Sequence, residues 1–460
     1  MKKVFLAGIG GIGMANVAAL LKEGGYDVGG SDANIYEPAA SVLKRAGIEP
    51  LTPYCADNIP TDGTPVIIGN ALSRGHAEVE AALDAHVPMY SFPDFLNRFV
   101  MSQRPVMTVA GTHGKSTTTA CLAHLLDSAG LHPGFLIGAM PLNWPVGACW
   151  GGVEAPFVLE GDEYDCAFFD KRSKFLHYFP RILILGKVEY DHADIFPTLQ
   201  DMLLSFERLI RIIPRGGAIV YYSDCEATCR LVENAPCRKI AVGSTASSDW
   251  QLLPDIRGLA FRDPDGKQQS CDFSLPGQHN RLNGLMALAA AHSFGENMMD
   301  SFLAGLKTFR GLRRRLECLL ETPHLTIYDD FAHHPTAIAA AIDAVRERYP
   351  HRRLIAVVEP RSNTMVRNIF QDDLAESFKK ADQVVIGTVH RQDRIPVSDR
   401  LDLMRLSGDL GKSGIRCDYM NNSEIPMHLH RCLSDSGTVV LFMSNGGFDG
   451  IQLEFVRLMT

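Results

Sequence analysis

The sequence predicts an α/β protein of three domains, each built around a largely parallel sheet. Its 460 residues are more than one ordinary hydrophobic core accommodates, and the length corresponds to roughly three domains. Short apolar runs alternate with helical patterns along the chain, which is typical of parallel sheets covered by helices. The hydrophobic and charged fractions, 46% and 21%, are those of a globular protein and not of a disordered or fibrous one.

Charge and cysteine usage exclude several classes of protein. The formal net charge is −8 and no basic stripe is present, so a nucleic-acid partner is not expected. The cysteines are scattered, and the pair Cys225 and Cys229 lacks the spacing of a redox or zinc motif, which suits a reducing cytoplasm. No apolar run reaches the ~18 residues of a membrane span. We therefore expect a cytoplasmic protein without a membrane partner, and the sequence predicts no oligomeric state.

The first domain is placed at residues 1–104. Apolar strand patterns at 2–8, 26–30, 65–72 and 87–90 alternate with helices, the first of them at 14–23. The basic start and apolar run also resemble a secretory signal, but its glycines each weaken a helix by about 1 kcal/mol and favour a strand, a turn and a new helix. The polar stretch 101–105 is interpreted as a linker.

The second and third domains are placed at 105–312 and 313–460. The second opens with a strand at 106–111 and a helix at 116–128, and continues with strands at 157–161, 181–186 and 217–223 and a helix at 279–294. The third opens near the arginine run at 311–317 and shows "LTIYDDF", a helix at 335–348, "RLIAVVEP", "DQVVIG" and "TVVLFMSNGG". Polar residues follow these strands, where open parallel sheets bind ligands.

Two glycine loops each join a strand to a helix. "GIGGIG" at 8–13 can present backbone N–H groups to an anion, and Asp32 stands where an acidic residue would bond a ribose. Taken alone, this loop predicts NAD or an unliganded glycine turn. "GTHGKSTTT" at 111–119 is more specific, because Lys115 supplies a cation for phosphates and the Ser116 hydroxyl can ligate Mg²⁺. Val109 replaces a glycine of the full Walker spacing, so this loop is a shortened variant that predicts ATP.

Carboxylates and a histidine follow strands of the second domain. Glu160 ends one strand, with Asp162, Glu163 and Asp165 close by, and His192 follows another. Such a residue in isolation is usually structural. Two such groups at strand ends of the phosphate-loop domain favour a Mg²⁺ site, since Mg²⁺ prefers hard ligands.

Seven motifs occur in one order over the whole chain: "GIGGIGM", "GTHGKSTTT", "EGDEYD", "DHADIF", "GQHNRLN", "RRRLE" and "DDFAHHPTAI". This order resembles the Mur ligases, ATP-dependent amide-forming enzymes of bacterial cell-wall precursor synthesis. The resemblance implies that the first domain binds a UDP-sugar and the central loop binds ATP, with closure about hinges near 101–106 and 311–317.

The resemblance also implies roles for individual residues, with Lys115, Glu160 and His192 as catalytic residues and Ser116, Glu160 and His192 as Mg²⁺ ligands. The residues implied for ATP are Gly111, Thr112, His113, Gly114, Lys115, Ser116, Thr117, Asn280, Asn283, Arg315 and Asp330. Those implied for the UDP-sugar are Gly8, Gly10, Gly11, Ile12, Gly13, Ser31, Asp32, Asn70 and Arg74. Those implied for a peptide substrate are His333, Arg361, Ser362 and Asn363.

Within the family, the first loop and "DDFAHHPT" resemble the branch that uses UDP-N-acetylmuramate directly. "DEYDCAFFDKRSKF", "EPRSNTM" and "MSNGGFDGI" are similar to the member that adds the murein tripeptide L-alanyl-γ-D-glutamyl-meso-diaminopimelate during peptidoglycan recycling. The alternative is the L-alanine-adding member of de novo synthesis. A non-enzymatic nucleotide sensor and an NAD-dependent oxidoreductase are rival classes, and the latter leaves the second loop without a use.

The chain departs from the tripeptide-adding pattern at two places. Gly161 stands where an alanine is usual, and Gly186 and Lys187 replace a pair of asparagines before the "DHADIF" box. If either asparagine orients a metal ligand or a phosphate, Lys187 must do so as a cation.

Overall fold

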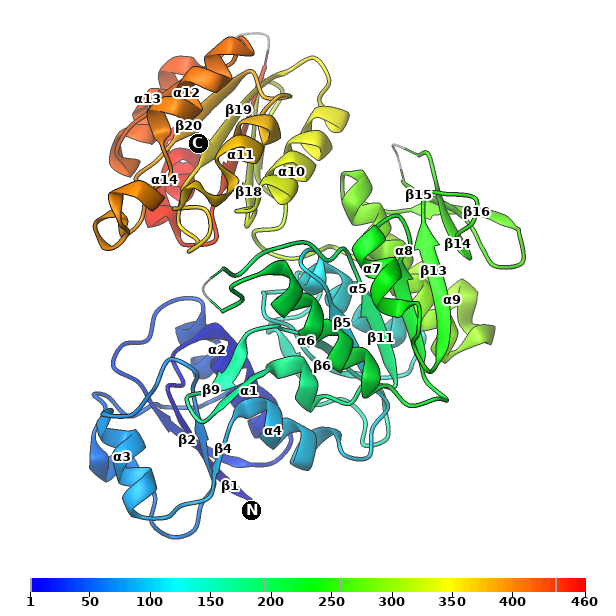
Figure 1. Ribbon diagram of the computed structural model, residues 1–460, viewed down its shortest axis with the longest axis vertical. Coiled ribbons are helices and arrows are strands. Elements are labelled where there is room, and N and C mark those ends of the chain that lie inside the picture. The colour runs from blue at the N-terminus through cyan, green and yellow to red at the C-terminus, as the bar shows by residue number, and fades with distance from the viewer. Residues whose placement is uncertain (1, 194, 256–257, 435–436) are drawn as a thin grey trace.

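The computed structural model describes residues 2–193, 195–255, 258–434 and 437–460. Asp194, within the motif at 191–196, lies outside the described residues. Successive parts of the chain each form a sheet with covering helices, and Figure 1 shows the N-terminal part and the C-terminal part on either side of the central one. The predicted α/β class and its parallel sheets are confirmed. Every helix among the described residues is too short or too polar to cross a lipid bilayer.

The N-terminal sheet has the strand order β2-β1-β3-β4, and its strands run parallel. The apolar side chains of β1 are buried, and α1 begins directly after the first glycine loop, with Gly11 as its N-cap. The elements of this part are β1 (Lys3–Ala7), α1 (Ile12–Glu23), β2 (Asp27–Ser31), α2 (Ala39–Arg45), β3 (Val66–Ile68), α3 (Ala77–Asp84), β4 (Met89–Tyr90) and α4 (Phe92–Leu96).

The central sheet has the order β16-β15-β14-β13-β12-β11-β5-β8-β6-β7, and its middle strands run parallel. An antiparallel extension, β14 to β16, was not predicted from the sequence. The elements are β5 (Val106–Ala110), α5 (Lys115–Ser128), β6 (Gly134–Leu136), β7 (Ala148–Cys149), β8 (Phe157–Glu160), β9 (Asp165–Ala167), β10 (Asp170–Ser173), β11 (Ile182–Leu185), α6 (Leu199–Arg211), β12 (Ala218–Tyr222), α7 (Glu226–Val232), β13 (Arg238–Gly243), β14 (Trp250–Leu253), β15 (Gly258–Arg262), β16 (Gln268–Asp272), α8 (Gln278–Phe294) and α9 (Met299–Thr308).

The C-terminal sheet has the order β17-β18-β22-β19-β20-β21. Among the described strands of this sheet, the pair β17 and β18 is antiparallel and the other neighbouring pairs are parallel. The elements are β17 (Glu317–Glu321), β18 (Leu325–Asp330), α10 (Pro335–Arg348), β19 (Arg353–Val358), α11 (Gln371–Ser377), β20 (Gln383–Ile386), α12 (Leu403–Lys412), β21 (Arg416–Tyr419), α13 (Ile425–Cys432), β22 (Thr438–Met443) and α14 (Ile451–Met459).

The apolar clusters differ between the parts. One cluster joins Leu20 and Tyr26 of the N-terminal part to Val106 and Phe157 of the central part. The C-terminal sheet instead has clusters of its own on its two faces. Because the side chains of a strand alternate between faces, β19 places Leu354 in one of these clusters and its neighbour in the other. The first two parts therefore share a core, whereas the C-terminal part keeps its own and meets the central part through contacts such as Arg281 with Glu347 and His113 with His334.

The two predicted hinge segments differ in their packing. Arg104, within the first segment, is buried, stacks on Trp150 at 5.0 Å and donates a hydrogen bond to its carbonyl at 2.5 Å. The second segment leaves the central part at Leu312, which bridges to Pro141. Arg314 and Leu316 follow with φ of 57° and 49°, a left-handed conformation that is uncommon outside glycine. The change of direction between the central and C-terminal parts is thus concentrated at 314–316.

Candidate active site

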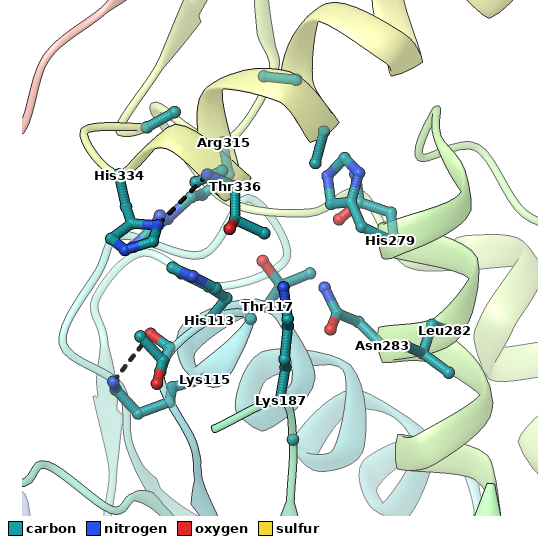
Figure 2. Close-up of a pocket in the computed structure, with 18 of the residues that line it drawn as sticks. His113, Lys115, Thr117, Lys187, His279, Leu282, Asn283, Arg315, His334 and Thr336 are labelled. Carbon is teal, nitrogen blue, oxygen red and sulfur yellow. Dashed lines mark hydrogen bonds between the residues drawn. The ribbon is translucent and has the colours of Figure 1, made fainter. Parts of the chain in front are cut away.

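A cavity of about 940 Å³ lies between the central and C-terminal parts, at the carboxyl ends of β5, β8 and β11. Figure 2 shows Lys115 and His113 reaching it from the second glycine loop, Asn283 and His279 from α8, and Arg315 and His334 from the C-terminal part. The structure therefore brings together residues that are far apart in the sequence. The expected site residues that line the cavity are Thr112, His113, Gly114, Lys115, Ser116, Thr117, Glu160, His192, Asn280, Asn283, Arg315, Asp330 and His333.

The second glycine loop has a backbone that only glycine fits. Gly111 and Gly114 have φ of 125° and 78°. A Cβ atom on Gly114 would lie 2.4 Å from the Asn283 side-chain oxygen, so a larger residue would clash with that side chain unless it moved. The loop is also tied to the segment after β11, because Thr112 donates its backbone N–H to the Lys187 carbonyl at 2.8 Å. The N-terminus of α5 faces the cavity and can accept an anion.

Lys115 and Ser116 each contact a carboxylate. Lys115 Nζ lies 3.0 Å from Glu163 Oε1, and the Ser116 hydroxyl donates to Glu160 Oε2 at 3.0 Å. Burial alone would lower the pKa of Lys115, but the neighbouring carboxylates, Glu163 above all, raise it, and the lysine is held as a cation. Burial raises the pKa of Glu160. A divalent cation on Glu160 would reverse that effect, and the hydroxyl and carboxylate together offer the hard oxygen ligands that Mg²⁺ prefers.

His192 contacts a different carboxylate from the one expected to share a metal ion with it. Its Nε2 lies 3.1 Å from Glu163 Oε1, and its ring packs edge-on against Tyr164. Among the described residues, histidine, cysteine and carboxylate side chains form two groups with metal-ligand spacing, and neither contains Glu160 or His192. One joins His113, Glu189 and His334, and the other joins Cys166, Asp170 and His177.

Arg315 lines the cavity, and among the described residues no carboxylate pairs with its guanidinium directly. Its guanidinium stacks on Phe331 at 4.7 Å and, among the described residues, makes no hydrogen bond. Its donors are therefore available to an anion. Asp330, by contrast, accepts hydrogen bonds from the backbone N–H groups of Leu316 and Ala332, each at 2.7 Å. These bonds tie the linker before β17 to the turn after β18, a role that the sequence did not indicate.

Asn280 and Asn283 both line the cavity, one helical turn apart on α8. Asn280 is buried, and its amide donates to the Pro276 carbonyl at 2.8 Å, whereas the Asn283 amide faces the glycine loop. His279 lines the cavity beside them, although it was not among the expected residues. Burial lowers its pKa to about 4, so the imidazole is neutral near pH 7.

The expected UDP-sugar residues lie around the first glycine loop. Gly8 has φ of 83°, Gly11 caps the helix that Ile12 and Gly13 begin, and Asp32 accepts the Gly10 N–H at 2.7 Å. The remaining contacts are between Ser31 and buried Glu78 at 2.6 Å, Asn70 and Asp165 of β9 at 2.8 Å, and Arg74 and Glu80 at 3.0 Å. Asp32 thus braces the loop, and its predicted bond to a ribose remains a prediction.

The expected peptide residues lie at two places. His333 lines the cavity, and its ring Nδ1 lies 2.9 Å from the Phe331 carbonyl. Arg361 follows β19 and pairs with Glu359 at 3.3 Å, while Ser362 accepts the Met365 N–H. Asn363 belongs to the same turn. The hydroxyl of the next residue, Thr364, donates a hydrogen bond to Asp191 Oδ1 of the central part at 3.3 Å. The pairing of Arg361 with a local carboxylate is the structural alternative to a role in substrate binding.

Both departures in the sequence have structural counterparts. A Cβ atom on Gly161 would lie 2.8 Å from the Thr108 side-chain methyl group, so an alanine there would require a local shift. The Lys187 ammonium lines the cavity and pairs with Glu189 Oε2 at 2.6 Å. Its charge is therefore paired locally, and a role for Lys187 in place of an amide remains a prediction.

Three family models match the chain in sequence. The Mur ligase family catalytic domain matches residues 4–104, the Mur ligase middle domain matches 109–291, and the Mur ligase glutamate ligase domain matches 314–446. The chain belongs to the Mur ligase family.

Individual Mur ligases resemble the whole chain. The UDP-N-acetylmuramate–L-alanyl-γ-D-glutamyl-meso-2,6-diaminoheptandioate ligase of Escherichia coli (strain K12) is 40% identical, over 98% of this chain and 96% of that protein. The crystal structure of a murein peptide ligase from Psychrobacter arcticus 273-4 is 33% identical, with a TM-score of 0.73 over 99% of this chain and 98% of that one. The UDP-N-acetylmuramate–L-alanine ligase of Clostridium kluyveri is 29% identical, over 97% of this chain and 96% of that protein.

Sequence reasoning missed Glu163 as a contact of both Lys115 and His192. The run "EGDEYD" signalled carboxylates near the loop, but their spacing alone does not reveal which one turns toward the lysine. It also missed the pairing of His113 with Glu189, across the turn after β11.

Proposed function

We propose that this Mur ligase joins the tripeptide L-alanyl-γ-D-glutamyl-meso-diaminopimelate to UDP-N-acetylmuramate, with ATP and Mg²⁺ as cofactors. The observation that carries this proposal is the convergence of Lys115, Ser116, Glu160 and Arg315 on one cavity between two parts of the chain. Those groups suit a phosphoryl donor and the charge that develops when it reacts. The greater similarity to ligases named for the tripeptide than to an L-alanine ligase supports the choice of amino substrate.

The chemistry begins with a carboxylate that cannot condense with an amine directly, because hydroxide is a poor leaving group. Transfer of the γ-phosphoryl group of ATP to the lactyl carboxylate of UDP-N-acetylmuramate gives an acyl phosphate and ADP. The peptide amino group then attacks the carbonyl carbon, the amine loses a proton, and phosphate leaves. Positioning and charge stabilisation supply most of the catalysis in phosphoryl transfer.

The chain's own residues have distinct parts in this reaction. Lys115 and Arg315 stabilise the phosphate charge from opposite sides of the cavity, one from each domain. Ser116, Glu160 and His192 are the residues that would hold Mg²⁺, which would supply positive charge to the phosphate oxygens. The N-terminal loop holds the UDP-sugar, and the segment after β19 receives the peptide. Closure of the C-terminal domain excludes water from the acyl phosphate.

A phosphate-release assay tests the proposal. The enzyme is given UDP-N-acetylmuramate, ATP and Mg²⁺ with either the tripeptide or free L-alanine, and kcat/KM is compared. We expect the tripeptide to be used more efficiently. Higher efficiency with L-alanine would assign the alanine-adding activity instead, and no phosphate release with either amine would favour a nucleotide sensor. Fluorescence of added NADH tests the oxidoreductase alternative, for which binding would be required.

A further inference from the structure

Lys115 has no hydrogen-bond donor left for a phosphate in this structure. Its ammonium group carries three N–H bonds, and three acceptors surround it: the Gly111 carbonyl at 2.8 Å, the Thr112 carbonyl at 3.3 Å and Glu163 Oε1 at 3.0 Å. Two of these acceptors belong to the glycine loop itself. Glu163 is the charged acceptor, and it comes from the segment after β8. A phosphate that binds Lys115 must displace one of these acceptors, and Glu163 is the one whose negative charge competes with it.

Glu163 is deeply buried, with a side chain that is 1% exposed. Its Oε1 atom contacts both Lys115 and His192, the latter at 3.1 Å, whereas its Oε2 atom has no hydrogen-bond partner among the described residues. A buried carboxylate is costly unless it is paired. Glu163 is thus held as an anion by two partners on one oxygen, and it loses the stronger of them whenever Lys115 moves.

We propose that Glu163 is a positioning residue, which holds Lys115 away from the phosphate position in the nucleotide-free enzyme and orients His192 for catalysis. This inference rests on the proposed function. A carboxylate that accepts a hydrogen bond from one ring nitrogen fixes the tautomer of a histidine and directs the other nitrogen, as is usual for metal-binding histidines. The Glu163–Lys115 contact competes with ATP, while the Glu163–His192 contact assists the reaction that follows.

The two contacts predict opposite effects of one substitution. Glu163→Gln removes the charge that retains Lys115, so a non-hydrolysable ATP analogue in the presence of EDTA should bind about five-fold more tightly or better. The same change removes the charged acceptor of His192, and kcat should fall about ten- to one-hundred-fold. Loss of a merely structural residue would weaken binding and turnover together. The measurements are calorimetric titration with the analogue and steady-state kinetics.

A matched control and a second variant sharpen the test. The control is Asp165→Asn, which removes a nearby carboxylate that pairs with Lys171 and contacts Asn70. This variant should bind the ATP analogue with unchanged affinity. Glu163→Asp keeps the charge at a shorter reach, and it should bind the analogue more tightly by a smaller factor and recover part of kcat. It also serves if Glu163→Gln does not fold, as judged by circular dichroism.

Unchanged or weaker analogue binding by folded Glu163 variants would overturn the positioning role. That outcome is distinct from failure of the proposed function, in which the wild-type enzyme itself would release no phosphate with either amine. Tighter analogue binding with undiminished kcat would likewise overturn the part that concerns His192.

Discussion

The two glycine loops of this Mur ligase occupy equivalent places between a strand and a helix but have very different surroundings. Both follow a buried parallel strand, both contain a glycine with positive φ, and both lead into a helix N-terminus. The first loop is braced by an acidic side chain, Asp32, which accepts the Gly10 N–H. The second carries Lys115 and faces Arg315 and Glu160 across a cavity. A glycine loop supplies a place for an anion, and the side chains brought to it from other elements determine whether chemistry can follow.

The largest expected effect comes from removing the lysine that the second loop carries and the first loop lacks. Lys115→Ala should lower turnover by on the order of 10³ or more, because it removes a charge that stabilises phosphoryl transfer. Binding of UDP-N-acetylmuramate should stay nearly intact, since we assign that ligand to the other loop. Steady-state kinetics and a direct binding assay measure the two quantities. Turnover within about ten-fold of wild type would contradict the role of this loop.

The reciprocal substitution is a control for that experiment. Asp32→Asn alters the side chain that braces the first loop. It should raise the KM for UDP-N-acetylmuramate and leave the KM for ATP unchanged. Equal effects on both substrates would show that the loops do not serve separate ligands.

The next effect concerns Glu160, which accepts a hydrogen bond from Ser116 of the second loop, and His192. Glu160→Gln keeps the shape of the side chain and removes its charge, so the Mg²⁺ concentration required for half-maximal activity should rise sharply, with partial recovery at high Mg²⁺. His192→Ala should lower turnover as well. Titration of activity with Mg²⁺ checks both variants. If neither titration moves, Glu160 and His192 are structural residues.

The strand, helix and carboxylate around the second loop were predictable from the sequence, because short-range sequence patterns determine them. The strand at 106–111, the helix after Lys115 and the carboxylate at the end of β8 follow from apolar runs, from glycine and from the tendency of parallel strands to present polar residues at one edge. The glycines at 111 and 114 have the positive φ that such a turn requires. These features depend on residues that are neighbours in the chain.

The features that escaped prediction depend on residues far apart in the chain. The strands β14 to β16 form an antiparallel extension whose outermost strand is half exposed and polar, so it lacks the apolar run that marks a buried strand. Lys115 contacts Glu163, and Asp330 accepts the N–H groups of Leu316 and Ala332. These pairings depend on the directions in which the side chains point in the folded chain. Hydrophobic periodicity carries no information about either.

A smaller effect is expected where the peptide is assigned, away from both loops. Arg361→Ala should raise the KM for the tripeptide about ten-fold, because a lost arginine–carboxylate contact costs roughly 1.5–3 kcal/mol. The KM values for ATP and UDP-N-acetylmuramate should barely change. Arg361 also pairs with Glu359, which is buried. If that pairing is its main role, the melting temperature would fall and all three substrates would be affected alike.

The smallest expected effect is on the pH dependence of stability around the second loop. Histidines line the cavity beside that loop, whereas "GIGGIG" contains none. Burial lowers the pKa of His333 and of His334 to about 4. In the unfolded chain these groups titrate near pH 6.5, so the unfolded state binds protons first as the pH falls. Stability conferred by the neutral imidazoles is complete above about pH 6.5 and is lost progressively toward pH 4.

His334→Asn isolates one of these histidines and retains the capping contact of its side chain. The His334 ring caps α10 by accepting the Thr336 N–H at 3.3 Å, and asparagine is itself a good N-cap that does not titrate in this range. The variant should therefore lose less stability than wild type between pH 6.5 and 4, by on the order of 1 kcal/mol. Urea unfolding at several pH values measures this slope. Glu189, whose pKa is lowered chiefly by its contact with His113 against the effect of burial, loses its contribution only at lower pH, so the two groups are separable. An unchanged slope in His334→Asn would show that its imidazole is not the group whose protonation opposes folding around the second loop.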